Sequence, residues 1–104
     1  MLPSKIDPEE ALRRTADGSA VLIDVREQDE FDEARVAGAR LIPLGDVAAR
    51  VAEVPKDRDV IVMCRSGRRS GEAQKILLER GYQRVANLEG GIIAWDEAGL
   101  PLQR

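Results

Sequence analysis

The chain contains no histidine and only one cysteine, Cys64. Without histidine it can form no Cys-His dyad, no Ser-His-Asp triad and no imidazole metal site. A single thiol also excludes an internal disulfide, a Cys-x-x-Cys redox pair and a multi-thiolate metal site. We therefore expect no metal and no cofactor, and any cysteine chemistry has to depend on Cys64 alone.

Long apolar runs and an excess of positive charge are also missing. No apolar run approaches the roughly 18 residues of a membrane span, and the segment from Met1 to Lys5 lacks the basic-then-apolar pattern of a signal sequence. The formal net charge of −3 at pH 7 argues against general nucleic-acid binding. We expect a cytoplasmic protein with neither a membrane nor a nucleic acid as partner.

Short apolar runs alternate with helix patterns along the chain. Its 104 residues, 43% hydrophobic and 34% charged, suit one soluble globular domain over residues 1–104. Asp7 and Pro8 begin a helix and Gly18 ends it. We expect strands at residues 20–25, 40–42, 60–63 and 84–88, and further helices at residues 28–34, 45–54, 70–80 and 92–98. The alternation predicts an α/β fold with a mostly parallel central sheet and helices on both faces.

Cys64 stands where the apolar run at residues 60–63 ends, and a loop with one glycine and three arginines follows it. Open α/β sheets bind ligands at the carboxyl ends of their strands. Gly67 permits a positive φ, so backbone N–H groups can converge on one centre. Backbone amides, a helix N-terminus and the nearby arginines all favour thiolate over thiol. Although a lone cysteine is often a buried hydrophobe, we predict a nucleophilic Cys64 in an anion-binding loop, which comprises Arg65, Ser66, Gly67, Arg68, Arg69 and Ser70.

Within this loop we expect Arg69 to brace the loop carbonyls, and Arg65 and Arg68 to face the mouth of the pocket. Ser70 is expected to cap the following helix. Farther along the chain, Trp95 is expected to serve packing.

Three other segments complete the predicted surroundings of Cys64. Asp24 and Arg26 are expected to form an ion pair under the pocket. The turn at residues 89–91 is expected to support the pocket wall. The acidic residues between positions 24 and 34 are interpreted as a solvated helix face, with Phe31 turned inward.

Together these residues resemble the single-domain rhodanese family of sulfurtransferases. The resemblance covers almost the whole chain, and its most specific parts are the cysteine loop and the final Leu-Glu-Gly-Gly segment. The matching stretches are Pro8-Glu9-Glu10-Ala11, Leu22-Ile23-Asp24-Val25-Arg26-Glu27, Glu30-Phe31, Gly38-Ala39, Ile42-Pro43-Leu44, Cys64-Arg65-Ser66-Gly67-Arg68-Arg69-Ser70, Gly81-Tyr82, Asn87-Leu88-Glu89-Gly90-Gly91-Ile92 and Ala94-Trp95.

The resemblance implies a rhodanese-like fold in which Cys64 carries sulfur. A small anionic donor such as thiosulfate would give its outer sulfur to the Cys64 thiolate. The resulting persulfide would be attacked by cyanide or a thiol, and a redox protein is one candidate source of that thiol. Loop amides would hold the negative charge, and no general base is required if the thiolate is already populated.

One segment departs from the family pattern. Related domains often read Gly-His-Ile-Pro-Gly-Ala where this chain has Ala34-Arg35-Val36-Ala37-Gly38-Ala39. We expect an altered local shape or surface there rather than lost chemistry.

Three other functions remain open. A phosphatase or arsenate reductase of the same fold would use Cys-x5-Arg, whereas the position six after Cys64 is Ser70 and Arg69 comes one place too early. A catalytically silent interaction module would typically lose the cysteine that this chain keeps. A redox sensor would lack a second thiol to resolve a sulfenic acid.

Overall fold

The computed structural model describes residues 2–104, which contain a five-stranded sheet in the order β1-β5-β4-β2-β3. All neighbouring strands are parallel. This confirms the predicted α/β fold; β1 alone was not predicted, because two residues are too short to show a pattern. The strands are β1 (Lys5–Ile6), β2 (Ala20–Asp24), β3 (Arg40–Leu41), β4 (Asp59–Met63) and β5 (Val85–Leu88).

Residues 2–104 also contain four α-helices and two short 3-10 turns, of which all but the last helix connect strands. The helices are α1 (Pro8–Ala16), α2 (Gln28–Glu33), α3 (Arg68–Glu79) and α4 (Gly91–Glu97). The predicted start of α1 is confirmed, since the carboxylate of Asp7 accepts the N–H of Glu10 at 2.9 Å and Pro8 is the first helical residue.

The prediction of a single helix at residues 45–54 is wrong. The segment forms two separate 3-10 turns, η1 (Leu44–Asp46) and η2 (Val51–Glu53). A glycine and several valines give it little helix propensity, and prolines on either side limit its length. Its buried residues Val47 and Val54 are instead held by packing against the sheet.

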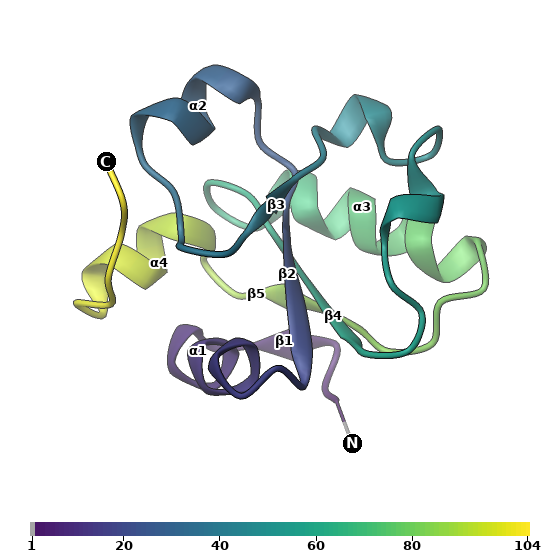
Figure 1. Cartoon of the computed structure of the whole chain (residues 1–104), viewed down its shortest axis with the longest axis horizontal. Coiled ribbons are helices and arrows are strands. Elements are labelled where there is room, and N and C mark those ends of the chain that lie inside the picture. Colours follow the sequence, from purple (N-terminus) through teal and green to yellow (C-terminus); the bar gives the residue numbers. More distant parts are fainter. Residues whose placement is uncertain (1) are drawn as a thin grey trace.

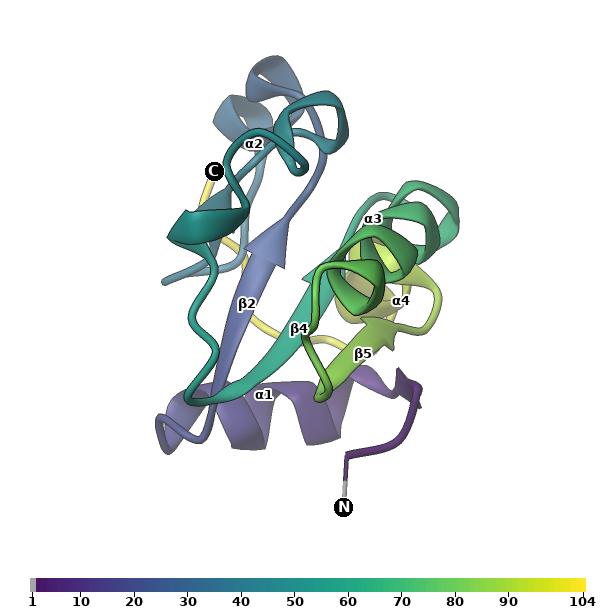
Figure 2. The same cartoon turned by 90° about the vertical axis from the view of Figure 1, so that its right-hand side faces the viewer.

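Alternate residues of each strand pack on opposite faces of the sheet. On one face, Val60 and Val62 of β4 pack with Ala73 and Leu77 of α3 and with the residues of the 3-10 turns. On the other, residues such as Ile61 and Met63 pack with α1 and α4, around the fully buried Trp95. In Figure 1, α3 lies to the right of the strands and α1 and α4 lie to the left; Figure 2 views the molecule from the side of α3, which there lies in front of α4. Because the side-chain direction alternates, Cys64 follows Val60 and Val62 onto the face covered by α3.

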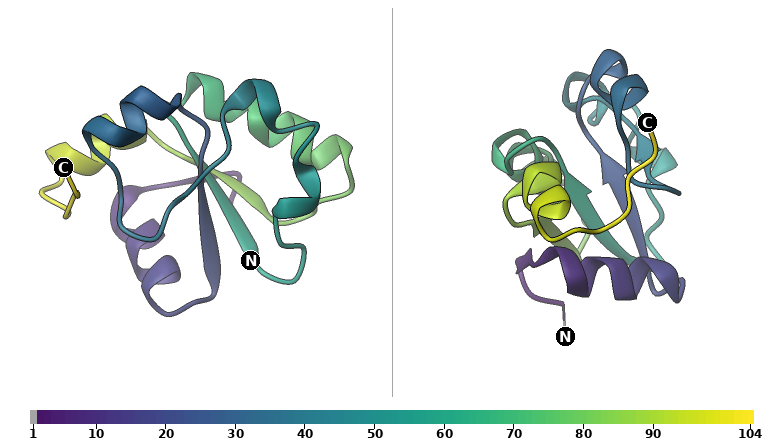
Figure 3. Two further views of the ribbon diagram at one scale, coloured as in Figure 1. Left: turned by 45° about the horizontal axis from the view of Figure 1, so that its top comes forward. Right: turned by 90° about the vertical axis from the view of Figure 1, so that its left-hand side faces the viewer.

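The carboxyl ends of β2 and β4 point toward α2, away from α1 (Figure 1). The chain after α2 pairs with the C-terminal segment, where the N–H groups of Arg35 and Gln103 each donate to the other residue's carbonyl, at 2.8 and 2.7 Å. Figure 3 shows this C-terminal segment rising beside the α2 region. The segment that departs from the family pattern is thus tied into the fold through Arg35. Within residues 2–104, no helix combines the length and the apolar character needed to cross a membrane.

Candidate active site

Cys64 lies directly after β4, with 1% of its surface exposed. The backbone N–H of Gly67 lies 3.1 Å from its Sγ, and the hydroxyl of Ser70 lies 3.3 Å from it. The N–H of Gly67 can turn toward the sulfur because this residue adopts a φ of 106°, in the left-handed region that favours glycine. The predicted convergence of loop N–H groups on the thiol is confirmed at Gly67.

The surroundings of Cys64 favour the thiolate. Burial acts to raise the pKa of the Cys64 thiol, but hydrogen bonds from the Ser70 hydroxyl and from the backbone N–H groups of Ser70, Gly67 and Ser66 outweigh it and lower the pKa below its ordinary value. The expected direction is confirmed. The expected contribution of the loop amides is confirmed, whereas no arginine is among the main causes of the lowered pKa.

Arg69 does not brace the loop carbonyls as expected. Its guanidinium binds both carboxylate oxygens of Glu30 in α2, at 2.7 and 2.9 Å. The hydrogen bond from Arg69 holds the pKa of Glu30 at about 2, and Glu30 in turn raises the pKa of Arg69. The partners are 39 residues apart, so sequence spacing could not reveal the pair. Arg65 and Arg68 are exposed, and Arg65 alone of the two lines the pocket beside the loop, so the expected position of Arg68 at the mouth of the pocket stays a prediction.

The interpretation of the acidic residues at positions 24–34 as a solvated helix face is therefore wrong at Glu30, and also at Asp24, which is fully buried at the end of β2. Oε1 of Glu30 also accepts the N–H of Glu27 at 3.0 Å, which closes a capping box at the start of α2. Phe31 is only half-buried, and the guanidinium of Arg35 lies 5.3 Å from the centre of its ring. Asp29, Asp32 and the other acidic residues of α2 are exposed as expected.

Ser70 does not cap α3, because the helix begins at Arg68 and Gly67 occupies the cap position. Ser70 instead lies in the first turn of α3, fully buried, with its hydroxyl 3.3 Å from the sulfur of Cys64 and 2.6 Å from Oδ1 of Asn87. The amide nitrogen of Asn87 donates to the carbonyl of Gly67 at 2.9 Å. Sequence reasoning gave Asn87 no role, although strand alternation places it on the same face as Val85 and hence under α3.

The turn at residues 89–91, which was expected to support the pocket wall, leads into the first residues of α4, and these hold the cysteine loop. The N–H of Ile92 donates to the carbonyl of Cys64 at 2.9 Å, and the N–H of Ile93 to that of Arg65 at 3.2 Å. Gly91 adopts a φ of +62°, and a Cβ there would lie 2.3 Å from the carbonyl oxygen of Arg65. Only glycine lets the two segments approach this closely. Trp95 serves packing as predicted, and its indole N–H donates to the carbonyl of Pro101 at 2.9 Å.

The predicted ion pair between Asp24 and Arg26 is confirmed. Nη2 of Arg26 lies 2.8 Å from Oδ2 of Asp24, with the two side chains 5% and 0% exposed. The guanidinium also donates to the carbonyls of Glu30 at 3.3 Å and Ala34 at 2.8 Å. Arg26 thereby holds α2 against the end of β2, and positions Glu30 opposite Arg69.

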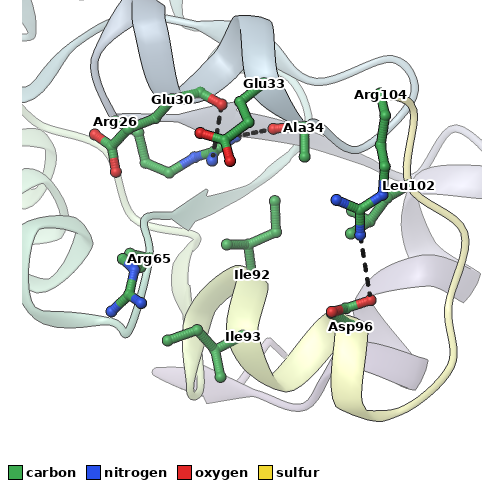
Figure 4. A pocket seen from close by; sticks show the side chains of 10 residues that line it. All are labelled: Arg26, Glu30, Glu33, Ala34, Arg65, Ile92, Ile93, Asp96, Leu102 and Arg104. Atoms are coloured by element: carbon green, nitrogen blue, oxygen red, sulfur yellow. Dashed lines mark hydrogen bonds and ion pairs between the residues drawn. The ribbon is translucent and has the colours of Figure 1, made fainter.

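A pocket of about 220 Å³ adjoins the loop at Arg65 (Figure 4). Its wall combines apolar side chains of Ile92, Ile93 and Leu102 with the exposed pair of Arg104 and Asp96, 3.8 Å apart. Across the part of the chain that the structure describes, there is no group of three or more cysteine or carboxylate side chains that could hold a metal ion.

Comparison with known proteins identifies relatives across almost the whole chain. Residues 7–98 match the family model described as a rhodanese-like domain. A protein of Allochromatium vinosum named sulfurtransferase is 44% identical over 100 residues, which cover 95% of this chain and 94% of that protein.

Two solved structures share the fold. A rhodanese-related protein from Thermoplasma volcanium has a TM-score of 0.88 and 26% identity, and the match covers 97% of this chain and 98% of that one. The rhodanese-like domain of an Anabaena protein also has a TM-score of 0.88, with 25% identity over 98% of this chain and 80% of that one.

Proposed function

The chain belongs to the rhodanese-like domain family, and we propose that it moves a sulfane sulfur from a small anionic donor such as thiosulfate to a thiophilic acceptor, with Cys64 as the carrier. Sulfurtransferase activity in general is supported by the family match and by the relative named sulfurtransferase. The observation that carries the proposal is the buried Cys64 sulfur, held by the Gly67 N–H and the Ser70 hydroxyl. This environment lowers the pKa of the thiol, and the thiolate is the nucleophilic form.

In the first step, the Cys64 thiolate attacks the outer sulfur of thiosulfate. A bond forms between Sγ and that sulfur, the sulfur–sulfur bond of thiosulfate breaks, and its electron pair leaves with sulfite. The negative charge of the thiolate passes to the outer sulfur of the Cys64 persulfide. No proton has to move, so the absence of histidine from the sequence does not hinder the step.

In the second step, cyanide or a thiolate attacks the outer sulfur of the persulfide. The bond from this sulfur to Sγ breaks, and its electron pair returns to Sγ as the thiolate. Thiocyanate or a new persulfide leaves, and Cys64 is ready for another donor. The loop N–H groups offer hydrogen bonds to the negative charge at both sulfur positions.

The loop residues have different proposed roles. Exposed Arg65 and Arg68 attract the anionic donor, and Ser66, Gly67 and Ser70 donate hydrogen bonds to sulfur. Arg69 contributes through its pair with Glu30, which fixes the start of α3 against α2. We further propose that residues 1–104 act as one domain in the cytoplasm.

The test is intact-protein mass spectrometry after incubation with thiosulfate. Wild type is expected to gain the mass of one sulfur, which cyanide or a reducing thiol removes, and Cys64→Ser is expected to gain none. Thiocyanate formation measures complete turnover, and an aryl phosphate serves as the competing substrate. A protein that takes up no sulfur from several classes of donor, or that hydrolyses the aryl phosphate efficiently, would contradict the proposal.

A further inference from the structure

Asn87 of β5 touches the Cys64 site but has no part in the sulfur chemistry as written. Its amide nitrogen donates to the carbonyl of Gly67 at 2.9 Å, and its Oδ1 lies 2.6 Å from the hydroxyl of Ser70. A backbone carbonyl can only accept a hydrogen bond, so the contact with Gly67 fixes which way the amide points. Asn87 therefore offers Ser70 an acceptor and no donor.

Ser70 has one hydroxyl proton and two neighbours that could accept it. Its Oγ lies 2.6 Å from Oδ1 of Asn87 and 3.3 Å from Sγ of Cys64. A single proton cannot serve both in full. If Cys64 is a thiol, its S–H can donate to Oγ while the hydroxyl donates to Asn87, and all three groups are satisfied. A thiolate has no proton to give, so it competes with Asn87 for the hydroxyl.

We propose that Asn87 is a positioning residue, which holds the Ser70 hydroxyl while the Cys64 sulfur is uncharged and yields it when negative charge builds on that sulfur. The exchange is favourable because hydrogen bonds to charged acceptors are roughly twice as strong as those between neutral groups. Ser70 is fully buried, which limits its exchange with solvent and keeps the choice between these two acceptors.

The exchange acquires a catalytic meaning only if the proposed function holds. The charge lies on Sγ in the free enzyme, moves to the outer sulfur in the persulfide, and returns to Sγ when the acceptor removes that sulfur. The Ser70 hydroxyl would then donate its hydrogen bond to Sγ at the start and the end of each cycle, and to Oδ1 of Asn87 while the persulfide exists.

Other charged groups surround the sulfur and have to stay constant in any test. Arg69 faces Cys64 from α3 and is bound to Glu30 of α2. The exposed Arg65 and Arg68 belong to the loop itself, and the pair of Arg26 with Asp24 lies at the end of β2. Replacing Asn87 and Ser70 by leucine and alanine leaves all of these charges in place.

The test is a double-mutant cycle on alkylation of Cys64 by iodoacetamide, followed against pH. In Asn87→Leu the Cys64 sulfur is the only acceptor left for the Ser70 hydroxyl, so the pKa of Cys64 is expected to fall. At a fixed pH below that pKa, alkylation is expected to become about threefold faster. Ser70→Ala is expected to slow alkylation about threefold in the wild-type background and about tenfold in the Asn87→Leu background.

The matched control is Gln74→Leu, which also removes an amide that binds two backbone carbonyls, those of Ser4 and Val85, each at 2.9 Å. It should leave the alkylation profile unchanged. If Asn87 merely supported the loop, Asn87→Leu would loosen the N–H groups around sulfur and raise the pKa of Cys64. That result, or equal effects of Ser70→Ala in both backgrounds, would overturn the proposal.

A second measurement does not depend on whether Asn87→Leu folds. At low pH the infrared S–H band of the wild-type protein belongs to Cys64, the only thiol in the chain. If the S–H donates to Ser70, this band lies below that of an exposed thiol and moves upward in Ser70→Ala. An identical band in both proteins would overturn the proposal. Neither measurement involves sulfur transfer, so a failure here would leave the proposed function standing.

Discussion

The carboxyl end and the amino end of the sheet are formed by the same strands but differ in how deeply their polar side chains are buried. At the carboxyl end, Asp24, Arg26 and Ser70 are all buried, and Ser70 lies against Cys64. At the amino end, Asp59 binds Arg14 and Arg84 at 3.2 and 3.0 Å, and these arginine side chains are 26% and 53% exposed.

Burial of polar groups destabilises a protein unless every group finds a partner. Within the described residues, no buried side-chain nitrogen or oxygen lacks one. At the carboxyl end the thiol therefore lies near buried polar side chains that all have hydrogen-bond partners, whereas the ion pairs of the amino end remain exposed to solvent. Variants matched between the two ends can test this contrast.

The largest expected effect is that of Gly91→Ala at the carboxyl end. The added Cβ would lie 2.3 Å from the carbonyl oxygen of Arg65 at a φ of +62°, and we expect a loss of about 4–5 kcal/mol in the free energy of unfolding. The control is Gly18→Ala near the amino end, where φ is +82° but no atom lies within 4 Å of the Cβ. Its expected loss is about 1 kcal/mol. Urea denaturation measures both, and similar losses would show that the close approach matters little.

The next effect is that of Arg26→Met, which leaves Asp24 buried without its partner. We expect a loss of about 3 kcal/mol, against less than about 1 kcal/mol for Arg84→Met in the exposed pair. Removing both buried charges, as in Asp24→Leu with Arg26→Met, should recover part of the loss. Urea denaturation of these variants provides the comparison, and equal losses at the two ends would contradict it.

Glu30→Gln is expected to lose about 1–2 kcal/mol at neutral pH, because the pair with Arg69 is partly screened by solvent. The pKa of Glu30 is about 2 in the folded protein against an ordinary 4.5. The carboxylate therefore stabilises the fold fully above pH 4.5, and this contribution is lost as the pH falls toward 2. Wild type and Glu30→Gln should converge in stability over that window. A difference that stays constant down to pH 2 would contradict the assignment.

The smallest expected effect is a difference in the pH at which thiols at the two ends of the sheet are alkylated. Cys64 should be alkylated by iodoacetamide at lower pH than a cysteine placed at exposed Ser19, since hydrogen bonds lower the pKa of Cys64. The control protein is Cys64→Ser with Ser19→Cys, which moves the only thiol to the amino end. Rates measured against pH give both profiles. Coinciding profiles would show that the loop does not favour the thiolate.

Local sequence patterns predicted most of the helices and strands. The apolar runs before Asp24 and Cys64 are buried on both faces, so their sequences alone mark them as strands of a parallel sheet. β1 escaped prediction because two residues carry no periodicity. The helix expected at residues 45–54 failed because its apolar spacing is shared by the two 3-10 turns that replace it.

The sequence by itself determined the single cysteine, its place after a central strand, and the glycines that let the loop close around it. Each of these depends on residue type or on neighbours along the chain. Only the tertiary structure decided that Arg69 binds Glu30, that Ser70 faces the sulfur and that Asn87 faces Ser70. These partners lie on different elements, and side-chain hydrogen bonds form over about 3 Å. Their pairing is fixed only when packing of α2, α3 and β5 brings the three elements together.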